Sequence, residues 1–330
     1  MQDAVKKYEV LYKKELKKVE KTFSNIYSKK KPHSLYEPIN YILRGGGKRI
    51  RPFLVAGAAK SAGSYPKNVY NASLAVEILH NFTLVHDDIM DNADKRRGRD
   101  TLHIRNNMDT AILAGDIMTA LAYESLLRDC GNNAHKVVSI FTNGIIEVCE
   151  GQALDKEFET RNNVSLKEYK VMIYKKTAAL MEMCCLIGAN LGKARPAQVK
   201  ALGSYGKNLG MAFQIQDDLL DLIAEEKELG KPVGGDLVEG KKTYLFIKAL
   251  EKARGNEKKM LLDVMKNKGI KKSEIEKYKS LYLKLGVIED AKKEIKYYTD
   301  KSVSSLKILG NKEGAELLKW LAFTLLQRNK

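Results

Sequence analysis

Residues 77–103 read EILHNFTLVHDDIMDNADKRRGRDTLH and contain two adjacent aspartates after an apolar run. That run has neither Gly nor Pro, so we predict that Asp87 lies on a helix. At 100° per residue, Asp87 and Asp91 then share one helix face about 6 Å apart, and Asp88 lies one step round the helix. Three carboxylates this close repel one another unless a cation neutralises them. Oxygen ligands alone favour a hard ion such as Mg²⁺, which binds a few carboxylates together with substrate phosphates.

The acidic pattern recurs in residues 213–221, FQIQDDLLD, where Asp217, Asp218 and Asp221 have the same spacing in a second apolar helix. A single copy of this pattern is equally compatible with a solvated acidic helix end. Two copies in one chain are not expected by chance, and acidic residues in apolar helices need a compensating charge. We therefore interpret the pair as a bipartite site for several metal ions and a diphosphate.

The composition predicts an all-α fold. The 330 residues are 44% hydrophobic and 30% charged, as in ordinary globular proteins, and six prolines leave long uninterrupted stretches between them. Strand-type alternation is nearly absent, and no linker divides the chain, so we predict a single domain over residues 1–330. We expect helices over 2–28, from Ser34 or Tyr36 to Arg44, and over 52–64, 68–91, 109–128, 134–152, 165 onward, 196–226, 244–254, 257–267, 271–284, 288–308 and 313–328, with a loop over 92–107.

The charge and the cysteines limit the protein class. The net charge is +17, but the lysines are scattered at helical spacing, which predicts a solvated surface and no nucleic-acid binding. Such a field would also attract a polyanionic small substrate. Cys130, Cys149, Cys184 and Cys185 form no CxxC pair, so we expect four reduced, buried cysteines in a cytoplasmic protein. The charged N-terminus has no signal-peptide core, and no apolar run predicts a membrane span.

Two basic motifs and one histidine near the first acidic motif could bind phosphate. Residues 45–52, GGGKRIRP, combine a flexible glycine run with Lys48 and Arg51, although a solvated interhelical turn is an equal alternative. The motif lacks the GxxxxGK[ST] pattern of a P-loop. Arg96 and Arg97 could grip a phosphate in bidentate fashion. His80 lies two turns before Asp87 on the same predicted face, where it is either a ligand-binding residue or a core histidine.

Further candidates lie later in the chain. Lys176 and Thr177 could donate to a phosphate if they are buried in a site. Residues 150–155 carry polar groups that we expect to line the same cavity. Residues 230–243 form a glycine-rich basic segment directly after the second acidic motif, as expected for a lid over a diphosphate.

Taken together, the motifs resemble the trans-type isoprenyl diphosphate synthases. The motifs GGGKRIRP, EILHNFTLVHDDIMDNADKRRG, KKT, FQIQDDLLD, GKPVGGD and GKKT match that family in order and spacing from about residue 36 to 245. The resemblance implies a large helical bundle, usually a homodimer, whose two acidic motifs face each other across a deep central cavity. It also implies condensation of isopentenyl diphosphate with an allylic diphosphate (dimethylallyl, geranyl or farnesyl). The three glycines before Lys48, where the family usually has two, are a small departure.

The resemblance also implies residue roles. Mg²⁺ ions bridging the allylic diphosphate would be bound by Asp87, Asp91 and Asp217, with Asp88, Asp218 and Asp221 supporting. The allylic diphosphate would be contacted by Arg96, Lys176, Thr177, Gln214, Lys231 and Lys241. Isopentenyl diphosphate would be contacted by Lys48, Arg51, His80 and Arg97. Catalysis is expected to depend above all on Asp87, Asp88, Asp91, Arg96, Lys176, Asp217 and Asp218.

The implied reaction needs no protein nucleophile. Breaking the allylic C–O bond leaves a carbocation and a diphosphate, whose charge Mg²⁺ and the Lys and Arg side chains stabilise. The double bond of isopentenyl diphosphate attacks the cation, and loss of a proton completes a product five carbons longer. An apolar cavity keeps water away from the cation.

Product length is expected to depend on the helix ahead of Asp87. Phe82 lies five residues earlier, about 7.5 Å along the helix axis, and its neighbour Thr83 is small. One aromatic residue here resembles synthases that stop at C20, so geranylgeranyl diphosphate is the expected product. Farnesyl diphosphate and longer products are the alternatives, and Phe82 could instead be a core residue.

Three other classes were weighed. A terpene cyclase shares an acidic motif, but GGGKRIRP makes sense only if a second diphosphate is bound. A helical di-metal protein needs two ExxH motifs and two further helical Glu, whereas Glu77 and His80 form a single ExxH. A non-catalytic binding protein would have no need of the buried acids.

Overall fold

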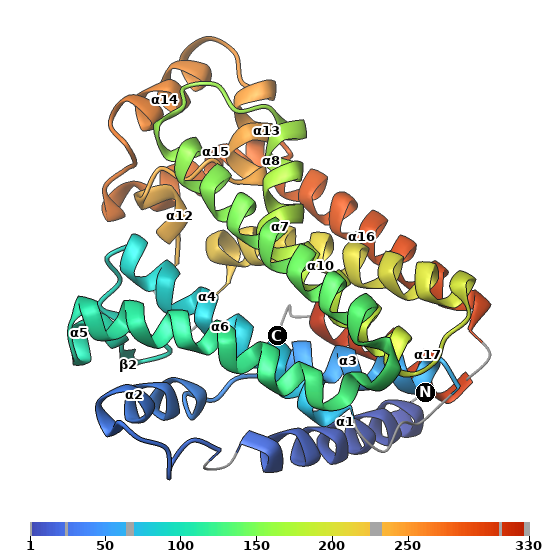
Figure 1. The fold of residues 1–330 in the computed structure, drawn as a ribbon. Coiled ribbons are helices and arrows are strands. Elements are labelled where there is room, and N and C mark those ends of the chain that lie inside the picture. Colours follow the sequence, from blue (N-terminus) through green and yellow to red (C-terminus); the bar gives the residue numbers. More distant parts are fainter. Residues whose placement is uncertain (1, 24–25, 64–68, 225–232, 310–311, 327–330) are drawn as a thin grey trace. The chain divides into compact units, whose positions relative to one another are not determined.

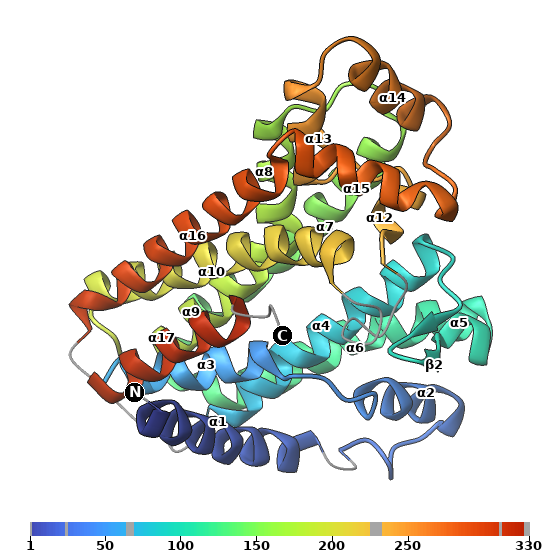
Figure 2. The ribbon, with the colours of Figure 1, turned by 180° about the vertical axis from the view of Figure 1, so that it is seen from behind.

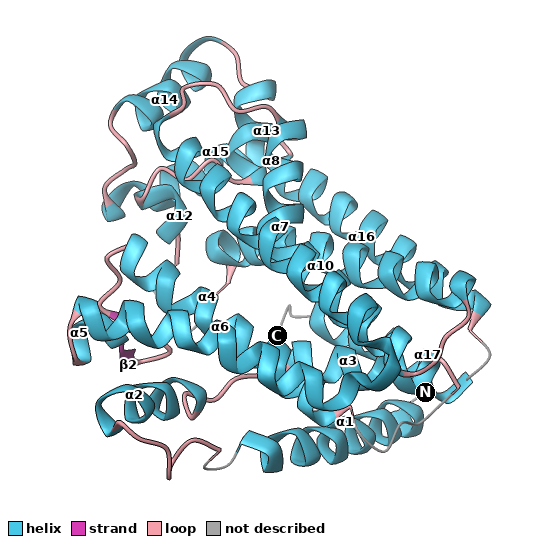
Figure 3. Cartoon of the chain, in the orientation of Figure 1, coloured by secondary structure: helices cyan, strands magenta, loops and turns pink. Residues whose placement is uncertain are grey.

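The computed structural model describes residues 2–23, 26–63, 69–224, 233–309 and 312–326 (Figure 1). In this part of the chain, helices dominate, and the strands are limited to one short hairpin (Figure 3). The predicted all-α fold class is therefore confirmed. The chain divides into two compact units: unit 1 is Met1–Thr142, Met183–Leu202 and Ile308–Trp320, and unit 2 is Asn143–Glu182, Gly203–Lys307 and Leu321–Lys330. The assignment of residues 1–330 to a single domain stays a prediction.

The N-terminal elements belong to unit 1. They are α1 (Gln2–Phe23), α2 (His33–Leu43), α3 (Ile50–Ser61), α4 (Tyr70–Met90), β1 (Lys95–Arg96), β2 (Arg99–Asp100), α5 (Leu102–Arg105), α6 (Met108–Cys130) and η1 (Gly131–Asn133). Helix α4 is apolar nearly all round and lies side by side with α6 in both views (Figures 1 and 2). This packing buries most of α4 and leaves only its C-terminal end, with the aspartates, near solvent.

The later elements continue the helical pattern. They are α7 (Ala134–Thr160), α8 (Leu166–Ile173), the π-helix η2 (Tyr174–Ala178), α9 (Ala179–Leu191), α10 (Pro196–Ile223), α12 (Gly235–Val238), α13 (Tyr244–Lys252), α14 (Gly255–Lys266), η3 (Lys272–Glu274), α15 (Ile275–Lys284), α16 (Val287–Ser305), η4 (Leu306–Ile308) and α17 (Lys312–Leu326). Helices α10 and α16 lie side by side in both views, and the Ser302 hydroxyl donates to the Tyr205 carbonyl over 3.1 Å (Figures 1 and 2). Around α10 the core of unit 2 is aromatic, with Tyr169, Tyr244 and Phe246 almost fully buried.

Local sequence signals set two helix starts that matter for the site. Ser165 and Glu168 form a reciprocal capping box at the start of α8, and Tyr169 follows directly. The Thr243 hydroxyl caps α13 by accepting the Phe246 backbone N–H. Both caps anchor segments that meet at the second acidic motif.

Several predicted boundaries were wrong. Helix α1 ends at Phe23, and residues 26–29 form a turn. The predicted loop over 92–107 contains the β1–β2 hairpin and α5, because Arg97 and Gly98 both adopt positive φ and form a two-residue hairpin turn. Helix α7 continues through Gly151 to Thr160, where we expected it to end at residue 152.

The cysteines and the apolar helices differ in part from expectation. Cys130, Cys184 and Cys185 are buried as expected, but Cys149 is exposed, so the prediction of four buried cysteines was wrong for this residue. Among the described residues, one helical stretch, Met108–Thr160, is long and apolar enough to span a membrane, and 44% of its most apolar part is buried. Core helices of soluble proteins pass the same test, so this observation is weak.

Candidate functional site

The first acidic motif lies at the C-terminal end of α4. The Asp88 side chain is 3% exposed and accepts a 2.6 Å hydrogen bond from Arg96 Nε. Asp87 is half-buried and Asp91 is exposed. Asp87 and Asp91, one helical turn apart, are therefore accessible to solvent, whereas Asp88 is buried and bonded to Arg96.

Burial raises the pKa of Asp88, while the charge of Arg96 and its hydrogen bond act in the opposite direction. Arg96 belongs to β1, so the hairpin is tied to the end of α4 through this pair. The Asp88–Arg96 pair thus holds the hairpin and its arginines beside the accessible carboxylates.

Arg97 occupies a conformation that is unfavourable for its residue type. Its φ is 54°, in the left-handed region, which costs a non-glycine residue about 1–2 kcal/mol. Its Nη1 donates to the Gly46 carbonyl over 2.5 Å. The β1–β2 hairpin turn imposes this conformation, and the ligand role of Arg97 stays a prediction.

The glycine-rich loop is held from several sides. Gly46 and Gly47 adopt φ values of 74° and 137°. Arg49, two residues after Gly47, forms a buried 2.7 Å ion pair with Glu77 on α4. The Tyr12 hydroxyl donates to the Lys48 carbonyl. The Lys48 side chain itself is exposed. We had assigned no role to Arg49; the structure makes it the anchor of the loop.

His80 is a neutral hydrogen-bond acceptor. Its Nε2 lies 3.1 Å from Arg51 Nη1, and because a guanidinium only donates, Nε2 accepts and the ring proton lies on Nδ1. Burial first, and then the charges of Arg51 and Arg97, hold the pKa of His80 well below its ordinary value. Within unit 1 the structure therefore brings together the predicted residues His80, Arg51, Arg96 and Arg97.

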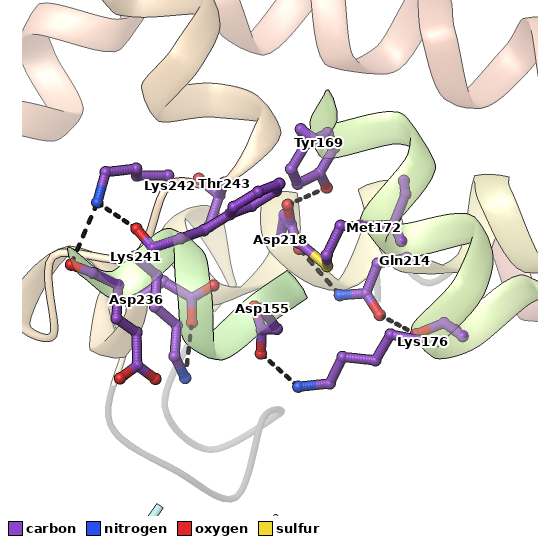
Figure 4. Close-up of a pocket in the computed structure, with 14 residues that line it drawn as sticks. Asp155, Tyr169, Met172, Lys176, Gln214, Asp218, Asp236, Lys241, Lys242 and Thr243 are labelled. Atoms are coloured by element: carbon purple, nitrogen blue, oxygen red, sulfur yellow. Dashed lines mark hydrogen bonds and ion pairs between the residues drawn. The ribbon is translucent and has the colours of Figure 1, made fainter. Parts of the chain in front are cut away.

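In the second acidic motif, three protein groups donate hydrogen bonds to Asp218. Its Oδ2 accepts from the Tyr169 hydroxyl over 2.5 Å, and its Oδ1 accepts from Gln214 over 3.0 Å (Figure 4). The Tyr244 backbone N–H also donates to Oδ2, over 3.2 Å. Burial raises the pKa of Asp218 to about 6, the charge of Asp217 adds to this, and the three hydrogen bonds oppose it.

The other two acids of this motif differ in exposure. Asp217 is exposed, whereas Asp221 is 3% exposed. Asp221 Oδ2 accepts the Asp236 backbone N–H over 2.9 Å, and its carbonyl accepts the Gly234 N–H over 2.6 Å. Asp221 therefore anchors the start of α12, which supports the expectation that it assists the site.

A cavity of about 140 Å³ lies beside Asp218. Its polar lining comes from α7, α8, η2, α10, α12 and the segment before α13 (Figure 4). Lys176 Nζ lies 2.5 Å from Asp155 Oδ2, and the Thr177 hydroxyl donates to Gln214 Oε1 over 2.8 Å. The polar residues of the lining are Asp155, Glu159, Tyr169, Lys176, Thr177, Gln214, Asp218, Asp236, Lys241, Lys242 and Thr243.

The π-helix directs the Lys–Thr pair into this cavity. A Cβ at Gly151 would come within 2.6 Å of backbone atoms of Lys175 and Lys176, so only a glycine on α7 lets η2 approach this closely. Lys175 then faces away and pairs with Glu147 at 2.6 Å and with Glu150 at 2.5 Å. π-helices are frequent at functional sites, and this one carries the predicted residues Lys176 and Thr177.

The sequence motifs did not indicate Tyr169, and they indicated Asp236 and Lys242 only as part of the predicted lid over residues 230–243. Tyr169 binds Asp218, Asp236 lines the cavity, and Lys242 Nζ donates to the Phe158 carbonyl over 2.6 Å, beside the end of α7. Tyr169 lies seven residues before Lys176, which is two helical turns and could have suggested a shared face. Asp236 and Lys242 belong to the motifs GKPVGGD and GKKT, which indicated the segment but not these two side chains. Of the predicted set, Lys231 falls outside the described residues, and Lys241 pairs with Glu239 at 2.7 Å.

The donor chemistry fits Mg²⁺. In the described residues, no three His, Cys, Asp or Glu side chains lie close enough together to hold a metal by themselves. Mg²⁺ does not require such a cage, because it typically takes one or two carboxylates and fills its remaining positions with water and substrate phosphate oxygens. The accessible Asp87, Asp91 and Asp217 match that requirement, since all are oxygen donors. Their cooperation in one bipartite site stays a prediction.

The predicted chain-length residues lie on α4. Phe82 is half-buried, and its ring packs edge-to-face on His86. The Thr83 hydroxyl donates to the His80 carbonyl over 2.8 Å, so it is used within the helix. Their role in product length is not tested by these contacts.

Comparisons with known proteins agree on one family. A polyprenyl synthetase family model matches residues 32–282. The geranylgeranyl diphosphate synthase of Saccharolobus solfataricus is 42% identical over 303 residues, which cover 90% of this chain and 91% of that protein. A short chain isoprenyl diphosphate synthase of Methanocaldococcus jannaschii is 46% identical over 246 residues, or 74% of this chain and 75% of that protein. The crystal structure of geranylgeranyl pyrophosphate synthetase from Pyrococcus horikoshii superposes with a TM-score of 0.87 at 35% identity, covering 98% of this chain and 100% of that chain.

Proposed function

The chain belongs to the polyprenyl synthetase family, and from this premise we propose that it makes geranylgeranyl diphosphate from isopentenyl diphosphate and an allylic diphosphate. The observation that carries the proposal is the combination of accessible aspartates with cationic and donor side chains in each unit. Farnesyl diphosphate or a longer polyprenyl diphosphate is the alternative product.

We propose that Mg²⁺ is required. Asp87, Asp91 and Asp217 would hold the ions, and Asp88, Asp218 and Asp221 would keep these motifs in place through the contacts described above. When bound, Mg²⁺ supplies positive charge that neutralises the diphosphate and makes it a better leaving group.

The chain's own cations have a separate task in this proposal. Arg96, Lys176 and Lys241, together with Lys231, bind the oxygens of the allylic diphosphate and stabilise the charge that grows as the C–O bond breaks. Thr177 and Gln214 contribute hydrogen bonds at the same place. Apolar lining from Met172 and Ile173 keeps water away from the carbocation.

The second substrate is assigned to unit 1. Lys48, Arg51 and Arg97 would bind the diphosphate of isopentenyl diphosphate. His80 accepts from Arg51 and so orients its guanidinium toward the ligand. A neutral His80 adds no charge of its own, which leaves recognition to the arginines and the lysine. The proton lost after condensation goes to the departing diphosphate.

We propose that the protein acts as a homodimer in the cytoplasm. Large apolar side chains are exposed along α5 and α6, an unusual feature for a free surface: Ile104 is 50% exposed, Met108 43%, Ile112 42%, Leu113 59% and Leu127 52%. A second copy that covers this face would remove these side chains from water. We expect no nucleic-acid partner and no integral membrane segment.

A product assay tests the enzymatic proposal. Purified protein, Mg²⁺ and isopentenyl diphosphate are incubated with dimethylallyl, geranyl or farnesyl diphosphate, and the dephosphorylated products are separated by length. We expect a dominant C20 alcohol and loss of turnover with EDTA. A dominant C15 product, or a product of C30 and longer, would support the enzyme class and contradict geranylgeranyl diphosphate as the product. Turnover of an allylic substrate alone, with isopentenyl diphosphate inert, would favour a terpene cyclase.

A further inference from the structure

The residue in front of the first acidic motif packs on the proposed chain-length residue. The rings of Phe82 and His86 are one helical turn apart on α4, and their centroids are 4.7 Å apart with an interplanar angle of 64°. This is the edge-to-face geometry that aromatic pairs favour. The orientation of the Phe82 ring is therefore coupled to the position of His86.

His86 occupies a niche that exists only because residue 115 is a glycine. A Cβ at Gly115 would come within 3.1 Å of the Nε2, Cδ2 and Cε1 atoms of the imidazole. Gly115 lies on α6, which runs beside α4 in both views (Figures 1 and 2). The imidazole is thus enclosed by the α6 backbone on one side and by Phe82 on another.

No hydrogen bond among the described residues explains why the Nε2 side of the His86 ring is buried. His86 Nε2 is buried and has no hydrogen-bond partner among the described residues. A buried polar atom without a partner destabilises the fold relative to an apolar group of the same shape. Steric fit between Gly115 and Phe82, not a polar contact at Nε2, keeps this side of the imidazole in place.

We propose that His86 is a positioning residue for product length: seated against Gly115, it fixes the Phe82 ring that ends the growing chain. The inference rests on the proposed function and on Phe82 as the end of the space for the prenyl tail. His86 directly precedes Asp87, a proposed ligand of the diphosphate-bound metal, and it contacts Phe82, the proposed end of the space for the tail. His86 therefore lies between these two parts of the site. No contact with substrate is assigned to it.

His86→Ala is the first test. Without the imidazole, the Phe82 ring gains room to rotate toward α6, and the space for the tail becomes longer. We expect the fraction of products longer than C20 to rise roughly threefold to tenfold, as follows from losing one aromatic contact. In a Phe82→Ala background the same change should lengthen the products no further, because His86 acts through Phe82.

Gly115→Ala should have the opposite effect. The added methyl group forces the imidazole away from α6 and toward Phe82, so the C15 share should rise. Adding His86→Ala should cancel this effect, because the clash disappears with the ring. If His86→Ala does not fold, the product lengths of Gly115→Ala test the proposal by themselves: a raised C15 share supports it, and wild-type products contradict it.

A buried residue elsewhere on α6 is the control. Leu121 is 4% exposed, and Leu121→Ala should lower stability while the C20 product persists. The proposal is overturned if the His86→Ala and Gly115→Ala products match those of the wild type, or if Leu121→Ala changes product length equally. A wild-type protein that forms no condensation product would instead reject the proposed function.

Discussion

Among single residues, the six aspartates differ in what their surroundings allow. Asp87, Asp91 and Asp217 reach solvent, whereas Asp88, Asp218 and Asp221 are at most 6% exposed and bind protein donors. The DDxxD pattern is the same in both motifs, so the difference comes from the neighbouring segments. Each motif thus combines metal-ligand candidates with carboxylates that hold the surrounding structure.

Substituting Asp217 and Asp221 should separate these two tasks. Asp217→Asn should lower turnover by about a hundredfold or more, because a charge at the diphosphate is lost, and should leave stability nearly unchanged. Asp221→Ala should lower the free energy of unfolding by about 1–3 kcal/mol, because the Asp236 N–H loses its acceptor. Steady-state rates and urea unfolding would measure both. Equal stability losses in the two variants would contradict this division.

His80 should give the protein a pH-dependent stability. In the unfolded chain a histidine takes up a proton below about pH 6.5, whereas the native His80 stays neutral because its pKa is held far lower. Below pH 6.5 the unfolded state therefore binds one more proton, and stability falls by about 1.4 kcal/mol per pH unit. This contribution is fully present above pH 6.5.

The check is urea unfolding between pH 5 and 7. His80→Gln should flatten the slope in that window. An unaltered slope in His80→Gln would mean that another group carries the pH dependence.

At the level of elements, the contact between α7 and η2 is decisive for the second motif. A glycine inside a helix costs about 1 kcal/mol relative to alanine. Here the missing side chain lets the π-helix backbone approach, and this approach places Lys176 and Thr177 at the cavity. Packing has outweighed helix propensity at this position.

Gly151→Ala should therefore destabilise the protein despite its better helix propensity. The methyl group would displace the backbone at Lys176, so we expect weaker binding of the allylic diphosphate by about tenfold or more, measured as KM. Ala153→Gly, at an exposed position on the same helix, is the matched control and should cost only about 1 kcal/mol of stability. Normal KM values in Gly151→Ala would show that η2 tolerates the displacement.

At the level of the whole molecule, the exposed apolar side chains of α6 point to assembly. Leu113→Lys should shift the protein from dimer to monomer, because a charge would be buried in the proposed interface. Leu283, 58% exposed on α15, offers a control: Leu283→Lys should leave the dimer intact. Light scattering after gel filtration measures both. A wild-type monomer would reject the homodimer.

The sequence by itself determined the helical fold class, the two acidic motifs and the basic motifs around them. These features depend on local properties: helix periodicity places Asp87 and Asp91 on one face, and carboxylates with nearby arginines and glycines have limited chemical uses. The family resemblance rests on the same local patterns. Local capping signals also place helix starts such as that of α8 at Ser165.

Only the tertiary structure decided which of these residues are buried and what they contact. The bond from Tyr169 to Asp218, the anchor between Asp221 and Asp236 and the seat of His86 against Gly115 join residues that lie 49, 15 and 29 positions apart. Helix periodicity does not extend across the loops that separate such residues. Their contacts depend on which helices pack together, and at Gly115 and Gly151 the absence of a single Cβ allows that packing.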